Sequence, residues 1–104
     1  MGRWTFSGRR SNVIRWDEPL QIKDDIRFSR VEEEGVVLRQ GEGEVLVVNE
    51  VGIRILELAQ EGASPNRILA ILEEEYDVEA GPLRKDVARF LEELTQAGVL
   101  GHGL

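Results

Sequence analysis

The chain has 104 residues, 41% of them hydrophobic, and a formal net charge of −7. This length favours one domain with a modest core. The negative charge disfavours free nucleic acid as a partner, because binding to nucleic acid depends on neutralising phosphates. The charge is uneven, since residues 1–30 sum to +3 and residues 31–104 to −10. The basic N-terminal segment is either a tail that contacts an acidic partner or a solvated terminus.

The chain contains no cysteine, which excludes disulfide bonds and thiolate chemistry. No apolar stretch is long enough to span a membrane. The N-terminus also lacks the continuous apolar block of a secretion signal. We therefore expect a cytoplasmic protein with no membrane partner.

Residues 1–25 show no steady hydrophobic period, and their aromatic residues are separated by Arg, Ser, Gly and Asn. This pattern predicts a flexible N-terminal arm, followed by a folded domain over residues 26–101. The arm could contact a partner, or cover a sheet edge in a swapped homodimer.

Three short strands are predicted next. Residues 26–31 alternate apolar and polar side chains, which is typical of a half-buried strand. Residues 36–39 and 44–48 are rich in β-branched residues, and the connections before and between them contain glycine. These segments predict a three-stranded antiparallel sheet.

Three helices are predicted after the strands. Asn49 is a good N-cap for a helix over residues 50–60, and Ser64 followed by Pro65 begins the second. Pro82 opens the third, which ends before Gly98. The sequence therefore predicts an α+β fold, in which a three-stranded antiparallel sheet is followed by a three-helix winged-helix-like bundle.

A winged-helix fold raises the alternative of a DNA-binding regulator, whose third helix would carry basic residues into the major groove. Here that helix has Arg84, Lys85 and Arg89, but also three carboxylates, Asp86, Glu92 and Glu93. It does not form a convincing basic surface. A protein–protein adaptor, which would use the basic arm with its two tryptophans, is another alternative.

The sequence offers little for catalysis. The one histidine, His102, lies near the C-terminus without a placed partner, and the runs of glutamate are typical of solvated faces. The spacing of His, Asp and Glu fits no metal site, and the glycines at 41 and 43 lack the Lys and Ser/Thr of a phosphate loop. We therefore expect no enzyme activity, no cofactor and no metal.

Binding of a peptide remains as a function. If the strands are ordered as in the sequence, residues 44–48 form a free edge that can accept an extended peptide. On the third helix, Leu83, Val87, Phe90 and Leu94 predict a core stripe. The neighbouring stripe holds Ala88, which would leave a dent, and Leu91, which would form its floor. Arg84 and Lys85 could pair with an acidic peptide residue. The alternative is that all of these are ordinary core and rim positions.

Two segments resemble the PqqD family, whose members are also called RiPP recognition elements. VNEVGIRIL, residues 48–56, is similar to the family pattern Leu-Asn-x-x-Gly-x-x-Ile-Leu, with Val48 in place of the usual Leu. DVARFLEELTQAGVL, residues 86–100, resembles the pattern Asp-Val-x-x-Phe-Leu-x-x-Leu-x-x-x-Gly-Leu/Val. The resemblance covers about residues 26–100.

This resemblance implies a non-catalytic domain that binds the leader of a ribosomally made, post-translationally modified peptide and delivers it to a modifying enzyme. The enzyme would be, for example, a radical enzyme, a protease or a cyclase. The leader would add as a strand along the third strand, in the cleft beside the third helix. Carried onto this chain, the implied peptide-binding residues are Glu44, Val45, Leu46, Val47 and Val48 on the strand, and Arg84, Val87, Ala88 and Leu91 on the helix.

Overall fold

The computed structural model describes residues 14–101 of the chain. Three strands form an antiparallel sheet in the order β2-β3-β4, and three helices follow it. The α+β fold predicted from the sequence is confirmed. The bounds are β1 Gln21–Ile22, β2 Ile26–Val31, β3 Glu34–Arg39, β4 Glu44–Val48, α1 Glu50–Gln60, α2 Pro65–Tyr76, α3 Ala80–Gln96 and β5 Leu100–Gly101.

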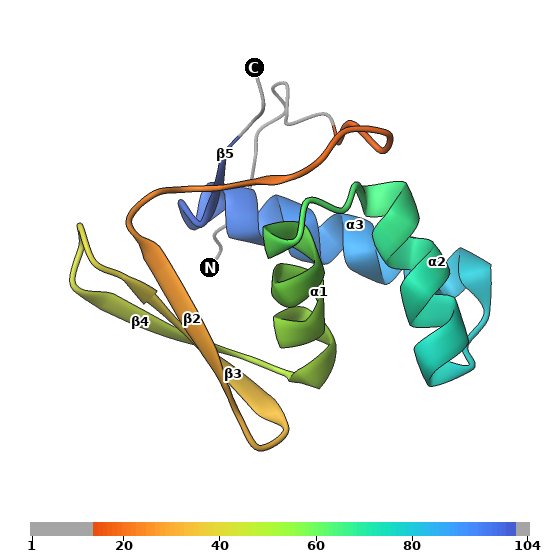
Figure 1. Cartoon of the computed structure of the whole chain (residues 1–104), viewed down its shortest axis with the longest axis horizontal. Helices are drawn as coiled ribbons and strands as arrows, with labels where there is room; N and C mark the ends of the chain where they lie inside the picture. The colour runs from red at the N-terminus through yellow and green to blue at the C-terminus, as the bar shows by residue number, and fades with distance from the viewer. Residues whose placement is uncertain (1–13, 102–104) are drawn as a thin grey trace.

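One face of the sheet packs on α1, which lies between the sheet and α2, while α3 crosses behind them (Figure 1). Val37, in the central strand, is fully buried. Its neighbour Gly35 allows α1 to approach closely, because a Cβ atom there would lie 2.5 Å from the Cβ of Ile53. The core then continues between the helices through Leu56, Ile68, Leu72, Val87, Leu91 and Leu94.

The helix starts follow the capping residues in the sequence. The side chain of Asn49 accepts a hydrogen bond from the backbone N–H of Gly52 at 2.8 Å, and that of Ser64 accepts one from Arg67 at 3.2 Å. The third helix begins at Ala80, two residues before the predicted start. Pro82 lies in its first turn, where the missing N–H needs no partner inside the helix.

Residues 14–25 pack onto the domain and are not a free arm. β1 pairs with β5 next to the end of α3, and the backbone N–H of Asn66 donates to the carbonyl of Trp16 at 2.9 Å. The guanidinium of Arg84 lies 3.8 Å from the centroid of the Trp16 ring, a cation–π contact. The prediction of a flexible arm is therefore wrong for residues 14–25, which are part of the folded domain. The rest of the predicted arm, residues 1–13, and His102 lie outside the described residues.

A set of ion pairs links the sheet to the first two helices. Glu57 on α1 accepts two hydrogen bonds from Arg30 on β2, at 2.8 and 3.1 Å. Arg54, one turn before Glu57, forms a similar double contact with Glu75 on α2 at 2.7 and 2.9 Å. The hydrogen bonds from Arg30 are the main reason why the pKa of Glu57 is lowered, and those from Arg54 lower the pKa of Glu75.

No helix within residues 14–101 has the length and apolar character needed to cross a membrane.

The ion pairs predict how stability changes with pH. A carboxylate whose pKa is lower in the folded state contributes fully above its unfolded-state pKa, and this contribution is lost as the pH falls through the folded-state value. The free energy of unfolding should therefore decrease between about pH 5 and pH 3. Glu57→Gln should cost roughly 0.5–1 kcal/mol at pH 7, because the pairs are partly exposed, and should flatten this decrease.

Urea unfolding of the wild type and the variant across this pH range measures the effect. The control is Glu92→Gln, since Glu92 is an exposed glutamate on α3. If Glu57→Gln and Glu92→Gln give the same pH profile, the ion pairs contribute nothing measurable.

Candidate functional site

β4 is an edge strand. Within the described residues it pairs with β3 alone, in a register that places Val47 opposite Val36 and Val45 opposite Leu38. Alternate backbone N–H and C=O groups along its other side therefore have no partner strand. Val45 and Val47 are 58% and 66% exposed, so no described segment packs closely on the face of β4 that carries them.

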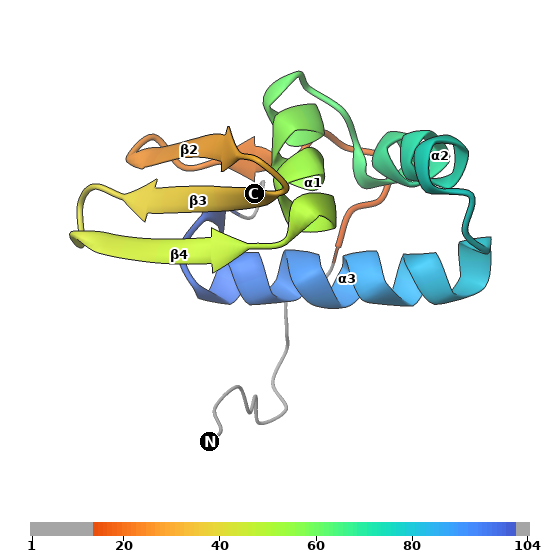
Figure 2. The same ribbon diagram turned by 90° about the horizontal axis from the view of Figure 1, so that it is seen from below.

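Helix α3 runs beside this free edge (Figure 2). Gly52, in the first turn of α1, lies between Phe90 on α3 and Val48 at the end of β4. A Cβ atom on Gly52 would lie 2.7 Å from the ring atom Cζ of Phe90 and 3.0 Å from the Cβ of Val48. The end of β4, the start of α1 and the middle of α3 therefore meet at one point.

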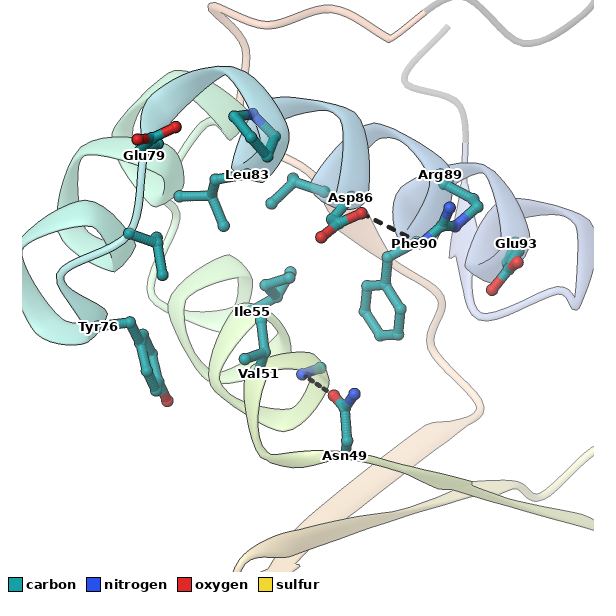
Figure 3. Close-up of a pocket in the computed structure, with 14 residues that line it drawn as sticks. Asn49, Val51, Ile55, Tyr76, Glu79, Leu83, Asp86, Arg89, Phe90 and Glu93 are labelled. Atoms are coloured by element: carbon teal, nitrogen blue, oxygen red, sulfur yellow. Dashed lines mark hydrogen bonds and ion pairs between the residues drawn. The ribbon is translucent and has the colours of Figure 1, made fainter.

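A cavity of about 530 Å³ opens at this meeting point. Its apolar walls come from α1 and α3, through Val51, Ile55, Leu83, Val87 and Phe90. Figure 3 shows Val51, Ile55, Leu83 and Phe90 between the two helices, with Asn49 after the end of β4 on one side. The remaining lining residues are Asn49, Gly52, Tyr76, Val78, Glu79, Pro82, Asp86, Arg89 and Glu93.

The charged residues of the lining are mostly acidic. Three carboxylates, those of Glu79, Asp86 and Glu93, line the cavity together with one guanidinium, that of Arg89. Arg89 donates a hydrogen bond to Asp86 at 3.2 Å, and both side chains are about two-thirds exposed. The charged groups at the cavity therefore sum to −2.

Tyr76 gives the cavity a neutral polar group. Burial is the main reason why the pKa of Tyr76 is raised, and the nearby carboxylate of Glu50 adds to the effect. The phenol therefore stays protonated at neutral pH and can act as a hydrogen-bond donor.

Among residues 14–101, no three His, Cys, Asp or Glu side chains are grouped as a metal ion would require.

The structure places the predicted strand residues on the free edge. Leu46 and Val48 are partly buried and pack against the core, whereas Glu44, Val45 and Val47 are exposed. Their alternation leaves one face of the strand towards the helices and the other towards solvent. A role for them in peptide binding stays a prediction.

Of the four predicted helix residues, Val87 alone lines the cavity. Leu91 is a core residue with 2% of its surface exposed, and Arg84 lies against Trp16. Neither they nor Ala88 line the cavity, whereas Val87 forms both core and cavity wall. The core stripe is Val87, Leu91 and Leu94, at the helical spacing i, i+4 and i+7. Of the predicted core stripe, Val87 and Leu94 are buried, whereas Leu83 and Phe90 are only partly buried and Leu91 takes their place in the core.

The cavity residues missed by this prediction are Leu83, Asp86 and Phe90 on α3, together with Val51 and Tyr76. The pattern of α3 held a signal for them, because its apolar stripe is wider than one buried row. A helix with two neighbouring apolar rows, here Leu83 and Phe90 beside Val87, Leu91 and Leu94, can bury one row in the core and turn the other towards a cavity.

Comparison with known proteins agrees with this architecture. Residues 34–100 match the family described as Coenzyme PQQ synthesis protein D (PqqD). The chain belongs to the PqqD family. No match was found among curated proteins.

Two solved structures are similar to this PqqD-family chain. One is TbiB1 in complex with the TbiA(beta) leader peptide, with 28% sequence identity and a TM-score of 0.74 over 81% of this chain and 96% of that chain. The other is a lasso peptide synthetase B1 complexed with the leader peptide, with 23% identity and a TM-score of 0.72 over 80% and 98% of the two chains. The second likeness bears on the fold alone.

One apolar row of α3 lies in the core and the other lines the cavity, so a Leu→Ala substitution should lower the free energy of unfolding by different amounts in the two rows. Leu91→Ala should destabilise the protein by about 2–5 kcal/mol, because it leaves a cavity in the core. Leu83 lines the cavity and is only partly buried, so Leu83→Ala should lower the free energy of unfolding by less than half as much. Urea or thermal unfolding measures both. A larger cost for Leu83→Ala would place the core on the row predicted from the sequence.

Proposed function

We propose that this chain binds the leader peptide of a ribosomally made precursor and delivers it to a modifying enzyme, without performing chemistry itself. The observation that carries the proposal is the free edge of β4 beside the cavity between α1 and α3. Membership of the PqqD family and the likeness to TbiB1, whose structure contains a leader peptide, support the same function.

The leader would bind by adding a fourth strand to the sheet. Its backbone would pair with the free N–H and C=O groups of β4, which gives affinity without sequence preference. Its side chains would alternate as those of β4 do. Those level with Leu46 and Val48 would turn towards α3, and those level with Val45 and Val47 would extend the exposed face.

In this proposal, sequence specificity comes from the apolar row of α3 that lines the cavity, Leu83 and Phe90. Phe90 lies at the end of the cavity nearest β4, and Leu83 and Val51 line its walls. A leader that continues past the end of β4 would bring a side chain to this cavity. An apolar peptide side chain that enters this cavity is removed from water, which favours binding by about 25 cal/mol per Å² of buried surface. Val87 contributes to the same wall, whereas Leu91 would act by holding α3 in place.

The enzyme that receives the leader would be a radical enzyme, a protease or a cyclase, as the resemblance to the family implies. A second copy of the chain is a competing occupant of the same edge, because an unpaired strand can pair with its own symmetry mate. Such a homodimer and the bound leader would occupy the same edge, so the chain could not form both at once.

A DNA-binding function finds less support. Arg84 is held against Trp16, and the exposed side of α3 carries Asp86, Glu92 and Glu93 beside Lys85 and Arg89. Such a mixed surface would repel phosphates as much as attract them. The adaptor alternative has no specific contact among the described residues in its favour.

Strand addition can be tested at Val47. Val47→Pro removes a backbone N–H from the edge strand and places a ring in the path of an added strand. Its affinity for the leader peptide of the precursor encoded beside this gene should fall about tenfold or more. Val47→Thr is the matched control, because it keeps the shape of the side chain and the N–H. Fluorescence anisotropy with a labelled leader measures both.

Both variants should first show cooperative unfolding, which establishes that the domain is intact. Equal affinity of the Pro and Thr variants for the leader would contradict strand addition to β4.

A further inference from the structure

The charge at the cavity is the reverse of the charge expected from the sequence. Arg84 and Lys85 were expected to meet an acidic residue of the peptide. In the structure Arg84 is directed to Trp16, and the side of α3 that lines the cavity carries Asp86 and Glu93 instead. Because α3 is rotated relative to the sequence-based prediction, the peptide expected to bind here carries a basic residue and not an acidic one.

We infer that the peptide segment bound in this groove carries a Lys or Arg close to an apolar anchor residue, and that Asp86 and Glu93 select it. This inference rests on the proposed function, because it concerns the ligand of the same groove. It goes further in naming the chemistry of the ligand and the residues that determine specificity.

The apolar part of the ligand follows from the cavity walls. Leu83, Ile55 and Val51 surround a space of about 530 Å³, and the ring of Phe90 closes it towards β4 (Figure 3). A space of this size accepts one large aliphatic or aromatic side chain with part of its backbone. A charged side chain placed at its centre would lose its hydration without a partner.

The basic part follows from the carboxylates. Asp86 and Glu93 lie at i−4 and i+3 from Phe90, so all three occupy one flank of α3. Figure 3 shows Asp86 and Glu93 on either side of the Phe90 ring along the helix. A cation beside the anchor would therefore meet Glu93 in one direction along the helix, and in the other Asp86, which it would share with Arg89.

Arg89 offsets only one of the two carboxylates on this flank. Its guanidinium lies on Asp86, and among the described residues no ion pair joins it to Glu93 or Glu79. With a charge of −2 on the lining, an acidic ligand residue would be repelled and a basic one attracted. Exposed pairs of this kind contribute little to affinity but discriminate between ligands of opposite charge.

The spacing limits where the basic residue can lie. Asp86 and Glu93 are seven positions apart on the helix, a rise of about 10 Å at 1.5 Å per residue. An extended peptide covers that distance in about three residues, at roughly 3.3 Å each. The Lys or Arg is therefore expected within about three positions of the anchor.

Selection from a displayed library of random twelve-residue peptides tests this inference on the full chain. Three proteins are compared, the wild type, Glu93→Lys and Glu92→Lys. The two substitutions change the net charge equally, on adjacent exposed residues of α3, but only Glu93 lines the cavity. Circular dichroism melting establishes that each variant is folded.

The expected result is that wild type and Glu92→Lys enrich peptides with a Lys or Arg within three residues of a large apolar residue, while Glu93→Lys loses this preference. An enriched peptide should bind Glu93→Lys roughly fivefold more weakly than Glu92→Lys at 50 mM salt. At 0.5 M salt the difference should largely disappear, because exposed charges are screened.

Peptides enriched without basic residues, or with the same basic preference in Glu93→Lys, would overturn the inference and leave the proposed function standing. If no peptide is enriched by any of the three proteins, the proposed function fails, and this inference fails with it. A wild-type dimer that becomes a monomer in Val47→Pro would assign the groove to a second copy, which would also overturn the inference.

Discussion

The contact between Gly52 and the ring of Phe90 sets the geometry on which the groove depends. It brings the first turn of α1, the end of β4 and the middle of α3 together, and only a residue without a Cβ allows so close an approach. A larger residue at position 52 would push α3 away from the sheet edge. The cavity next to this contact lies between α1 and α3, because α3 has one apolar row in the core and turns a second row, Leu83 and Phe90, towards the cavity.

Elements whose form depends on nearby residues could be predicted from the sequence. The capping side chains of Asn49 and Ser64 mark the starts of two helices, since a cap is a contact over three residues. The three strands of the main sheet likewise follow from alternation and from glycine-containing turns. The free edge of β4 followed from the same reasoning, because strands joined by short turns are neighbours in the order of the chain.

Features that depend on distant residues were not predicted. The rotation of α3 is decided by which side chains fit between α1 and α2, so periodicity identified its apolar side but not which row is buried. Residues 14–25 resembled an arm because they have no regular period. They are nevertheless held by single contacts to remote elements, such as the stacking of Arg84 on Trp16 and the pairing of β1 with β5. The ion pairs of Glu57 and Glu75 also join residues more than twenty positions apart.

The central claim is that a leader peptide completes the sheet at β4, and amide hydrogen exchange of the full chain with and without the leader tests it most directly. An added strand would cover the alternate N–H groups of residues 44–48 that do not pair with β3, so the exchange of these groups should slow markedly when the leader is bound. The amide NMR signals in the middle of α3 should also shift when the leader is added, because the peptide side chains contact that helix. These shifts should be smaller than those of the β4 amides. If the leader binds while exchange along β4 stays the same, or slows only along β2 at the opposite edge, the account is contradicted.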